Sequence, residues 1–270
     1  MLNIIKDIKE MRIQSANTIA IESLKYLKKI ANKYDFGKKF YYVSKKLEDA
    51  RPTAVGLHNC LEIIKKEKNI ATIDNLINKL SNAPTIIAKN ASMIFPKNRK
   101  VTILTHCHST NVVKTIIKNK KYVKSVFVTE TRPRDQGLLT AKDLLKKKIP
   151  VEYMIDSAIG YYINQIDFVL VGADALRKEG LINKIGTYPI AVVAKENKKP
   201  FYVVTSTFTL DKRNKFIIEE RPKSEITNKH ISGAKLHNPA FDITPWKYVS
   251  LIITEKGIHK PDKIINGDFQ

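Results

Sequence analysis

The chain has 270 residues, of which 43% are apolar and 27% are charged, as is ordinary for a globular protein. No apolar run reaches the roughly 18 residues that a membrane span needs, and the first residues lack the apolar core of a signal peptide, so we expect a cytoplasmic protein. The net charge of +22 attracts polyanions, either nucleic acid or a phosphorylated metabolite. The lysines are spread along the chain without interleaved aromatic residues, which disfavours nucleic acid.

Residues 1–97 are predicted to form a helical domain. Apolar residues recur there at spacings of three and four, as in Leu24 and Leu27 or Leu61 and Ile64. We expect a helix break at residues 35–37, a helix that opens at Arg51-Pro52, and a second break at residues 81–84. Cys60 lies among apolar residues in the middle of one predicted helix and is assigned to the core.

Residues 98–270 are predicted to form a second domain with a doubly wound, mostly parallel sheet. Short apolar runs alternate there with helical segments, and several are continuously apolar, as parallel strands buried on both faces are. The predicted strands are residues 101–107, 125–130, 151–155, 168–174, 201–204 and 251–255. The polar, irregular stretch 209–236 is expected to form a long loop, with a role as a lid left open.

Ligands of open α/β sheets bind beyond the carboxyl ends of the strands, so the residues at those ends are the candidates for a site. Cys107 ends the first predicted strand and precedes a helix. A helix N-terminus lowers a thiol pKa and offers free N–H groups to anions, so residues 109–111 (Ser109, Thr110 and Asn111) are candidates for binding phosphate beside an acid/base cysteine. The alternative is a small buried residue.

Asp174 ends the fourth predicted strand. It either caps the following segment or, if buried, has a raised pKa that suits a general acid. Asn183 and Lys184 lie nearby in the chain as candidate phosphate ligands, although Lys184, taken alone in such a lysine-rich chain, is expected at the surface. His106 and His108 flank the cysteine, and alternation along an extended segment would place both on the face opposite Cys107. No H-x-E or C-x-x-C motif supports a metal site, so we expect no metal.

Six motifs together carry a resemblance to a known superfamily. They are RPTAV (51–55), THCHS (105–109), TETRPRxQG (129–137), VGAD (171–174), NKIGT (183–187) and NPAFDxTP (238–245). The chain resembles the superfamily of translation initiation factor 2B regulatory subunits, which includes methylthioribose-1-phosphate isomerase and archaeal ribose-1,5-bisphosphate isomerase. The spellings THCHS and VTETRPR look closer to the ribose-1,5-bisphosphate branch.

The resemblance implies a helical N-terminal domain, a Rossmann-like C-terminal domain, and a homo-oligomer, either a dimer or a trimer of dimers. The implied reaction converts α-D-ribose 1,5-bisphosphate to D-ribulose 1,5-bisphosphate in nucleotide degradation, with AMP as a candidate activator and no cofactor. Cys107 would accept a proton and Asp174 would donate one. The implied substrate-binding residues are Ser15, Ala16, Arg51, Ser109, Thr110, Asn111, Asn183 and Lys184.

The chain departs from the family pattern at two places. Gln14 stands where the isomerase usually has a basic residue, and Ser15 replaces a glycine; Ser15 still offers its N–H and hydroxyl group. Thr209 stands where the family often has a lysine, for which Lys212 or Arg213 is a candidate replacement. A methylthioribose-type isomerase and a non-catalytic regulatory subunit therefore stay open as alternatives.

Overall fold

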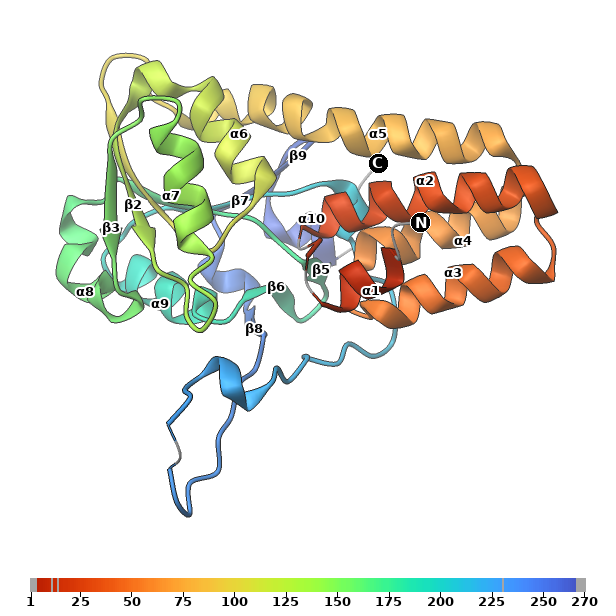
Figure 1. Ribbon diagram of the computed structural model, residues 1–270. Helices are drawn as coiled ribbons and strands as arrows, with labels where there is room; N and C mark the ends of the chain where they lie inside the picture. The colour runs from red at the N-terminus through yellow and green to blue at the C-terminus, as the bar shows by residue number, and fades with distance from the viewer. Residues whose placement is uncertain (1–3, 11, 14, 230, 266–270) are drawn as a thin grey trace.

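A computed structural model describes residues 4–10, 12–13, 15–229 and 231–265 of the chain. A layer of long helices lies beside an α/β layer, and an irregular segment projects from the body (Figure 1). The helical layer ends near η1 (Ala91–Ile94) and the first strand begins at Val101. The predicted boundary between residues 97 and 98 falls in this connection, and the division into two domains stays a prediction.

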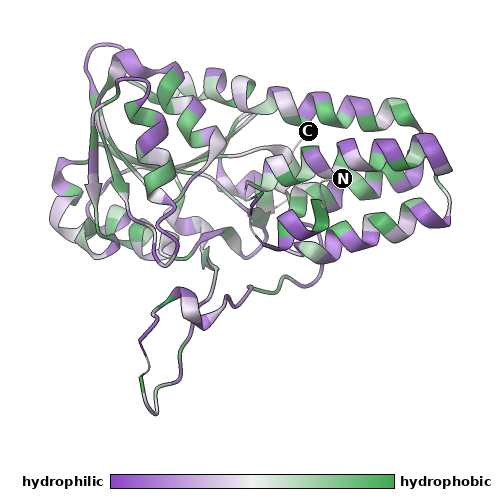
Figure 2. Ribbon diagram, in the orientation of Figure 1, coloured by the Kyte–Doolittle hydropathy of each residue, from purple (hydrophilic) through white to green (hydrophobic). Residues whose placement is uncertain are grey.

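Five helices form the helical layer. They are α1 (Ile4–Lys9), α2 (Ala16–Tyr34), α3 (Lys38–Ala50), α4 (Val55–Glu67) and α5 (Ile70–Asn90). Green and purple alternate along these helices in Figure 2, as expected of helices that bury one face. Their buried faces share one hydrophobic core that includes Leu24, Leu61 and Cys60, so the assignment of Cys60 to the core is confirmed.

Two predicted helix boundaries are wrong. Arg51 and Pro52 lie in the turn before α4, which begins only at Val55. Residues 81–84 do not break a helix, because α5 runs through Pro84. A proline removes the hydrogen bond to the carbonyl group four residues earlier, here that of Leu80. The Asn17 side-chain amide donates to this carbonyl oxygen at 3.2 Å, which compensates for the loss.

Seven strands form the main sheet in the order β10-β9-β7-β4-β1-β2-β3. They are β1 (Val101–Thr105), β2 (Val123–Thr129), β3 (Val151–Met154), β4 (Phe168–Val171), β7 (Phe201–Val204), β9 (Leu251–Thr254) and β10 (Gly257–His259). All neighbours pair in parallel except β10 with β9. The six predicted strands all belong to this sheet, and the predicted fold class is confirmed.

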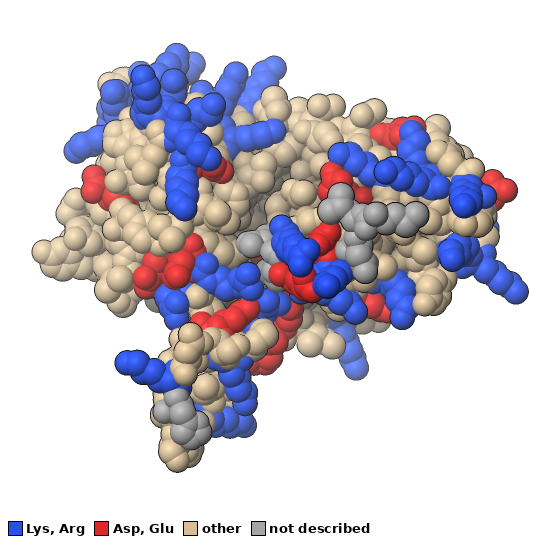
Figure 3. Space-filling model, in the orientation of Figure 1, with Lys and Arg blue, Asp and Glu red and all other residues tan. Residues whose placement is uncertain are grey.

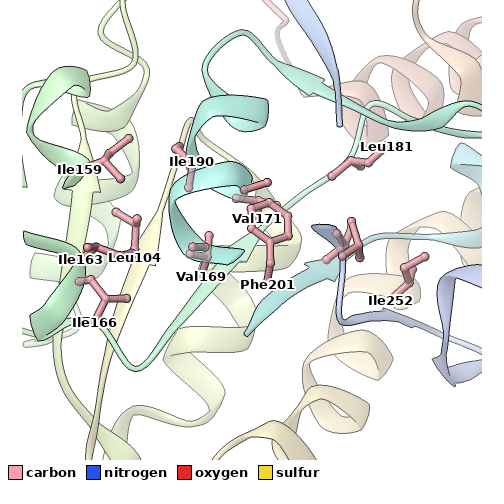
Figure 4. Packing of buried hydrophobic residues seen from close by; sticks show 14 of the residues in the cluster. Leu104, Ile159, Ile163, Ile166, Val169, Val171, Leu181, Ile190, Phe201 and Ile252 are labelled. Carbon is pink, nitrogen blue, oxygen red and sulfur yellow. The ribbon is translucent and has the colours of Figure 1, made fainter. Parts of the chain in front are cut away.

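Helices cover both faces of this sheet. They are α6 (Thr110–Lys118), α7 (Gly137–Leu145), α8 (Ile159–Tyr162), α9 (Thr187–Glu196) and α10 (Pro261–Ile265). Alternate residues of one strand enter different cores: Leu104 packs with residues of α8 and α9, as Figure 4 shows, whereas Ile103 packs with α6 and the end of α5. The continuous apolar runs reflect this burial on both faces.

A second, three-stranded antiparallel sheet was not predicted. It consists of β5 (Ala175–Arg177), β6 (Gly180–Lys184) and β8 (Phe241–Thr244), with Asn183 paired opposite Asp242. Single 3-10 turns complete the described secondary structure: η2 (Lys120–Tyr122), η3 (Asp156–Ala158), η4 (Ile163–Gln165), η5 (Thr207–Thr209), η6 (Lys223–Glu225) and η7 (Trp246–Tyr248). The small sheet joins the end of β4 to the NPAFD motif.

Residues 212–229 and 231–238, here called the arm, are mostly irregular and project away from the body in Figure 1. The predicted long loop at 209–236 overlaps the arm, although its first residue belongs to the turn η5. Lys and Arg side chains gather most densely at the upper left in Figure 3, over α6 and α7, and further groups lie on the helical layer, in keeping with lysines on solvent-facing surfaces. Within the described part of the chain, no helix combines the length and apolar character that crossing a membrane requires.

Candidate active site

The main sheet changes its winding direction between β1 and β4. From β1 the chain proceeds to β2 and β3 on one side, and from β4 it proceeds to β7 and β9 on the other. Cys107 follows β1 and Asp174 follows β4, so both residues lie at this switch point. Ligands of open α/β sheets bind in the crevice that forms there.

One pocket at the switch point gathers all ten residues predicted to be catalytic or substrate-binding. It is lined by Ser15, Ala16, Arg51, Cys107, Ser109, Thr110, Asn111, Asp174, Asn183 and Lys184. The first three come from the helical layer and the others from the α/β layer. Asn17, Gln136, Phe208 and Phe241 also line it. The pocket therefore lies where the two layers meet.

The surroundings of Cys107 correct two expectations. Its φ of 69° lies in the left-handed region, so the segment is not extended, and His106 and His108 line the same pocket instead of facing away. Burial raises the pKa of the Cys107 thiol to about 11, against the lowering expected from the helix N-terminus. The charge of Lys184 and a hydrogen bond from the His108 backbone act in the opposite direction but do not outweigh burial.

Asp174 has the electrostatic environment predicted for a buried general acid. Burial raises the pKa of its carboxyl group above the ordinary value, while the charges of Arg51 and Lys184 act to lower it. Lys184 thus acts electrostatically on both Cys107 and Asp174. The Cys107 thiol and the Asp174 carboxyl group are therefore electrostatically coupled, and each holds its proton more tightly than it would in water.

Two helix N-termini point to anion binding in the pocket. Ser15 is the N-cap of α2 and Ser109 is the N-cap of α6, and neither side chain caps its helix. The first N–H groups of a helix have no partner within the helix and carry a partial positive charge. Gly172 permits the close approach of β4 to α6, because a Cβ atom there would lie 2.6 Å from Ser109 Oγ.

Lys184 is buried in the site. It is only 9% exposed and Asn183 only 5%, so the alternative that Lys184 is a surface residue is wrong. The Lys184 ammonium group lies 5.3 Å from the centre of the Phe241 ring, and Asn183 donates to Thr187 Oγ1 at 3.0 Å. Phe241 and Asn183 come from strands that pair in the small sheet.

Arg51 supplies the second cation of the described pocket lining. Its Nε atom donates to Thr53 Oγ1 at 3.3 Å and lies 3.7 Å from Glu219 Oε2 at the base of the arm. The arm thus meets the site at its base.

The departures from the family pattern are not compensated as proposed. Lys212 is exposed, and Arg213 pairs with Asp211 at 2.8 Å; neither residue lines the pocket. Thr209 does line it, and its hydroxyl group donates to Ser206 O at 2.7 Å. Gln14 lies outside the described residues.

Sequence reasoning missed the pocket wall formed by Asn17 and Phe208. The Asn17 amide donates to the Leu80 carbonyl oxygen, which places Asn17 beside Pro84. The Asn59 amide of α4 donates to the Phe208 carbonyl oxygen at 2.8 Å and so holds that backbone in place. Pro84 was the sequence signal for this wall. A proline inside a helix leaves a carbonyl oxygen without its helical hydrogen bond, so a polar side chain must lie nearby to donate to it.

The fold defines a class of protein, an α/β protein with a helical layer and a ligand pocket at the switch point of a doubly wound sheet. The model of the Initiation factor 2 subunit family matches residues 12–261, and the chain belongs to this family.

Two groups of enzymes are among the named relatives. The ribose 1,5-bisphosphate isomerase of Methanocaldococcus jannaschii is 40% identical over 96% of this chain and 92% of its own. Five archaeal relatives with this name have identities of 34–40%. The methylthioribose-1-phosphate isomerase of Acetivibrio thermocellus is 37% identical over 80% of this chain and 73% of its own.

Solved structures share the whole architecture. The translation initiation factor eIF-2B of Pyrococcus horikoshii OT3 matches with a TM-score of 0.84 and 27% identity over 98% of both chains. The tetrameric eIF2B-beta2-delta2 complex of C. thermophilum matches over 97% of this chain and 91% of the other with a TM-score of 0.74 and 16% identity, which shows the fold alone. The family therefore includes proteins named as isomerases and proteins named as initiation factors.

Proposed function

We propose that this protein is an aldose–ketose isomerase that converts α-D-ribose 1,5-bisphosphate to D-ribulose 1,5-bisphosphate. The observation that carries the proposal is the pocket, which brings Cys107 and Asp174 together with two helix N-termini and two cations. The names of the archaeal relatives support the same reaction.

The pocket offers two separate groups of anion ligands, which suits a substrate with a phosphate at each end. The N-terminus of α6 at residues 109–111, with Lys184, would hold one phosphate. The N-terminus of α2 at Ser15 and Ala16, with Arg51, would hold the other. Asn183 would bind the sugar between them.

Asp174 would open the ring. The oxygen on C1 carries a phosphate, so the sugar cannot open to a free aldehyde, and the ring oxygen must be protonated as its bond to C1 breaks. A carboxyl group with a raised pKa still holds the proton that this step consumes. The resulting Asp174 carboxylate then takes the proton of the C2 hydroxyl group as C2 becomes a carbonyl carbon, which restores the acid.

Hydrogen must also move from C2 to C1, and two routes achieve this. In the enol route, the Cys107 thiolate takes the C2 proton and returns it to C1. With a thiol pKa of about 11, the thiolate is the minor form at neutral pH, so this route speeds up as the pH rises. In the hydride route, the hydrogen passes directly from C2 to C1 and does not exchange with solvent.

The test is direct. Purified protein is given ribose 1,5-bisphosphate, and ribulose 1,5-bisphosphate is measured; wild type should form it, whereas Cys107→Ser and Asp174→Asn should lose most activity. Equal product from these variants would refute the mechanism, and no product from wild type would favour a non-catalytic regulatory subunit. Substrate deuterated at C2 separates the routes, because only the hydride route retains all the deuterium at C1.

Methylthioribose 1-phosphate is the second candidate substrate. Leu80, Pro84 and Phe208 form an apolar wall in the pocket, which suits a methylthio group better than a phosphate. The same assay with this sugar decides between the two. A higher kcat/KM for methylthioribose 1-phosphate would assign the protein to the second group of relatives.

We further propose that the chain assembles with copies of itself and that AMP activates it. A solved structure with the same fold is a tetramer of beta and delta subunits, which agrees with the first point at the level of the fold. Light scattering of the purified protein measures the assembly, with a dimer or hexamer expected. The assay with and without AMP tests the activator.

A further inference from the structure

His106 is buried between the two segments that carry Cys107 and Lys184. It directly precedes Cys107 and is only 2% exposed. Its Nδ1 atom lies 2.6 Å from Thr129 Oγ1, and its Nε2 atom lies 2.7 Å from the carbonyl oxygen of Ile185, the residue after Lys184. Both ring nitrogens therefore already have partners within the protein.

The hydrogen bonds of His106 have a defined direction. A carbonyl oxygen only accepts, so Nε2 carries a hydrogen and donates it to Ile185. Burial lowers the pKa of the His106 imidazole, which favours the neutral ring. Nδ1 of a neutral ring with a hydrogen on Nε2 is an acceptor, so the Thr129 hydroxyl group donates to it. Neither nitrogen is left to exchange a proton with a ligand.

The same chain of bonds continues to the backbone of Cys107. The Cys107 N–H group donates to Thr131 Oγ1 at 2.9 Å. The Thr131 hydroxyl group lies 3.1 Å from Thr129 Oγ1 and 3.2 Å from the Thr129 carbonyl oxygen. Cys107 and Ile185 are thus joined through three side chains, those of Thr131, Thr129 and His106, here called the relay.

The Cys107 end of the relay has two unusual backbone conformations that need support. Cys107 and Thr131 have positive φ angles of 69° and 63°, which are costly for residues other than glycine. Asp156 accepts the N–H group of Thr131 at 2.8 Å. At the other end, a Cβ atom on Gly186 would lie 3.0 Å from the His106 ring, so the ring packs directly against that segment.

We propose that His106 is a positioning residue, which fixes the segment of Lys184 against that of Cys107 so that the lysine charge reaches the cysteine sulfur. It exchanges no proton with the substrate. Asp242 holds the same segment from the other side, because its Oδ2 atom accepts the Gly186 N–H group at 2.8 Å. This role explains why the histidine directly precedes the cysteine in the T-H-C motif, and its importance for catalysis rests on the proposed function.

The test measures the thiol, not the reaction. Alkylation of Cys107 by iodoacetamide is followed by peptide mass spectrometry across a range of pH. His106→Phe keeps an aromatic ring but removes both hydrogen bonds, so the lysine charge should act less on the sulfur. The pKa of Cys107 should rise by about half a unit to one unit, and alkylation at pH 8 should slow by about 3- to 10-fold.

A double-variant experiment separates positioning from general damage. Lys184→Met should slow alkylation as well, and His106→Phe should have little further effect in that background, because the charge is already gone. Thr129→Val removes one hydroxyl group of the relay and keeps the shape of the side chain. It should also slow alkylation, and it replaces His106→Phe as the test if that variant does not fold. Thr105→Val is the matched control outside the relay and should leave alkylation unchanged.

Two outcomes would overturn the inference. One is an equal slowing by His106→Phe with and without Lys184. The other is an unchanged alkylation profile in folded His106→Phe or Thr129→Val. The alkylation test contains no sugar phosphate, so it stays valid even if the isomerase assay fails. If the protein is an active isomerase but His106 and Lys184 show no coupling, the positioning role is refuted and the proposed function is not.

Discussion

The two sides of the pocket are built from different physical means. The α/β side places Cys107 and Asp174 just beyond the ends of β1 and β4, where burial raises the pKa of each group. The helical side contributes the N-terminus of α2 and Arg51, which offer positive charge, and an apolar wall around Pro84. The comparison supports a proposed division of labour, in which the α/β side carries proton transfer together with one set of anion ligands, whereas the helical side contributes binding alone.

The largest effect should come from comparing the two cysteines. Cys107→Ala should lower kcat by about 10²- to 10⁴-fold, the range for loss of an acid/base group. Cys60→Ala should leave kcat within about twofold and lower the free energy of unfolding by roughly 1 kcal/mol, because it opens a small cavity in the helical core. Steady-state kinetics and urea unfolding measure both. A similar loss of kcat in both variants would remove the distinction between the two sides.

The second prediction concerns the cost of burial on the α/β side. Burial raises the pKa of Asp242 from 3.8 to about 6 in the folded protein. The folded state therefore binds a proton more tightly than the unfolded state, so the free energy of unfolding should fall as pH rises from about 4 through 6, by at most roughly 3 kcal/mol. Asp242 is still half protonated at its folded pKa of about 6, so the loss becomes complete and constant only above about pH 7.

Asp242→Asn checks this sign. The asparagine still offers an oxygen acceptor to the N–H groups of Gly186 and Tyr188, but it has no proton to release. Urea unfolding at pH 4.5, 5.5 and 7 should show a smaller fall in stability for the variant than for wild type. Parallel profiles for the two proteins would mean that Asp242 titrates normally.

The third prediction concerns binding on the helical side. Arg51→Met should raise the dissociation constant for ribose 1,5-bisphosphate by about 10- to 100-fold, equivalent to about 1.4–2.8 kcal/mol, and change kcat less. Isothermal titration calorimetry with Asp174→Asn as the inactive background measures this. Arg99→Met is a matched control, because Arg99 pairs with Asp167 outside the pocket at 2.7 Å. A fall in kcat without weaker binding would contradict the division of labour.

The α/β side was largely predictable from sequence because its strands are continuous apolar runs. Burial on both faces requires this pattern, and parallel strands bring their carboxyl ends to one edge. Cys107 and Asp174 could therefore be placed together without coordinates. The strand β5 spans only Ala175–Arg177, too short for a periodic pattern, so the small sheet that positions Lys184 was not found.

Other parts of the site depend on tertiary packing that local rules do not contain. The pKa of Cys107 is set by the balance between burial and a helix end, and only the packed structure shows that burial dominates. The positive φ of Cys107 breaks the alternation assumed for His106 and His108. Pro84 normally indicates a helix break, but a hydrogen bond from Asn17 on another helix permits α5 to continue.

That last contact gives the smallest predicted effect. Asn17→Ala leaves the buried Leu80 carbonyl oxygen without a donor from its side chain and should lower the free energy of unfolding by about 1 kcal/mol. Pro84→Ala restores an N–H group that can bond this carbonyl within the helix. In the Pro84→Ala background, Asn17→Ala should therefore cost much less, and a double-mutant cycle by urea unfolding should give a coupling of about 0.5–1 kcal/mol. If the two substitutions are strictly additive in the free energy of unfolding, α5 tolerates Pro84 by other means. The pocket wall formed by Asn17 and Phe208 would then not depend on the hydrogen bond from Asn17 to Leu80.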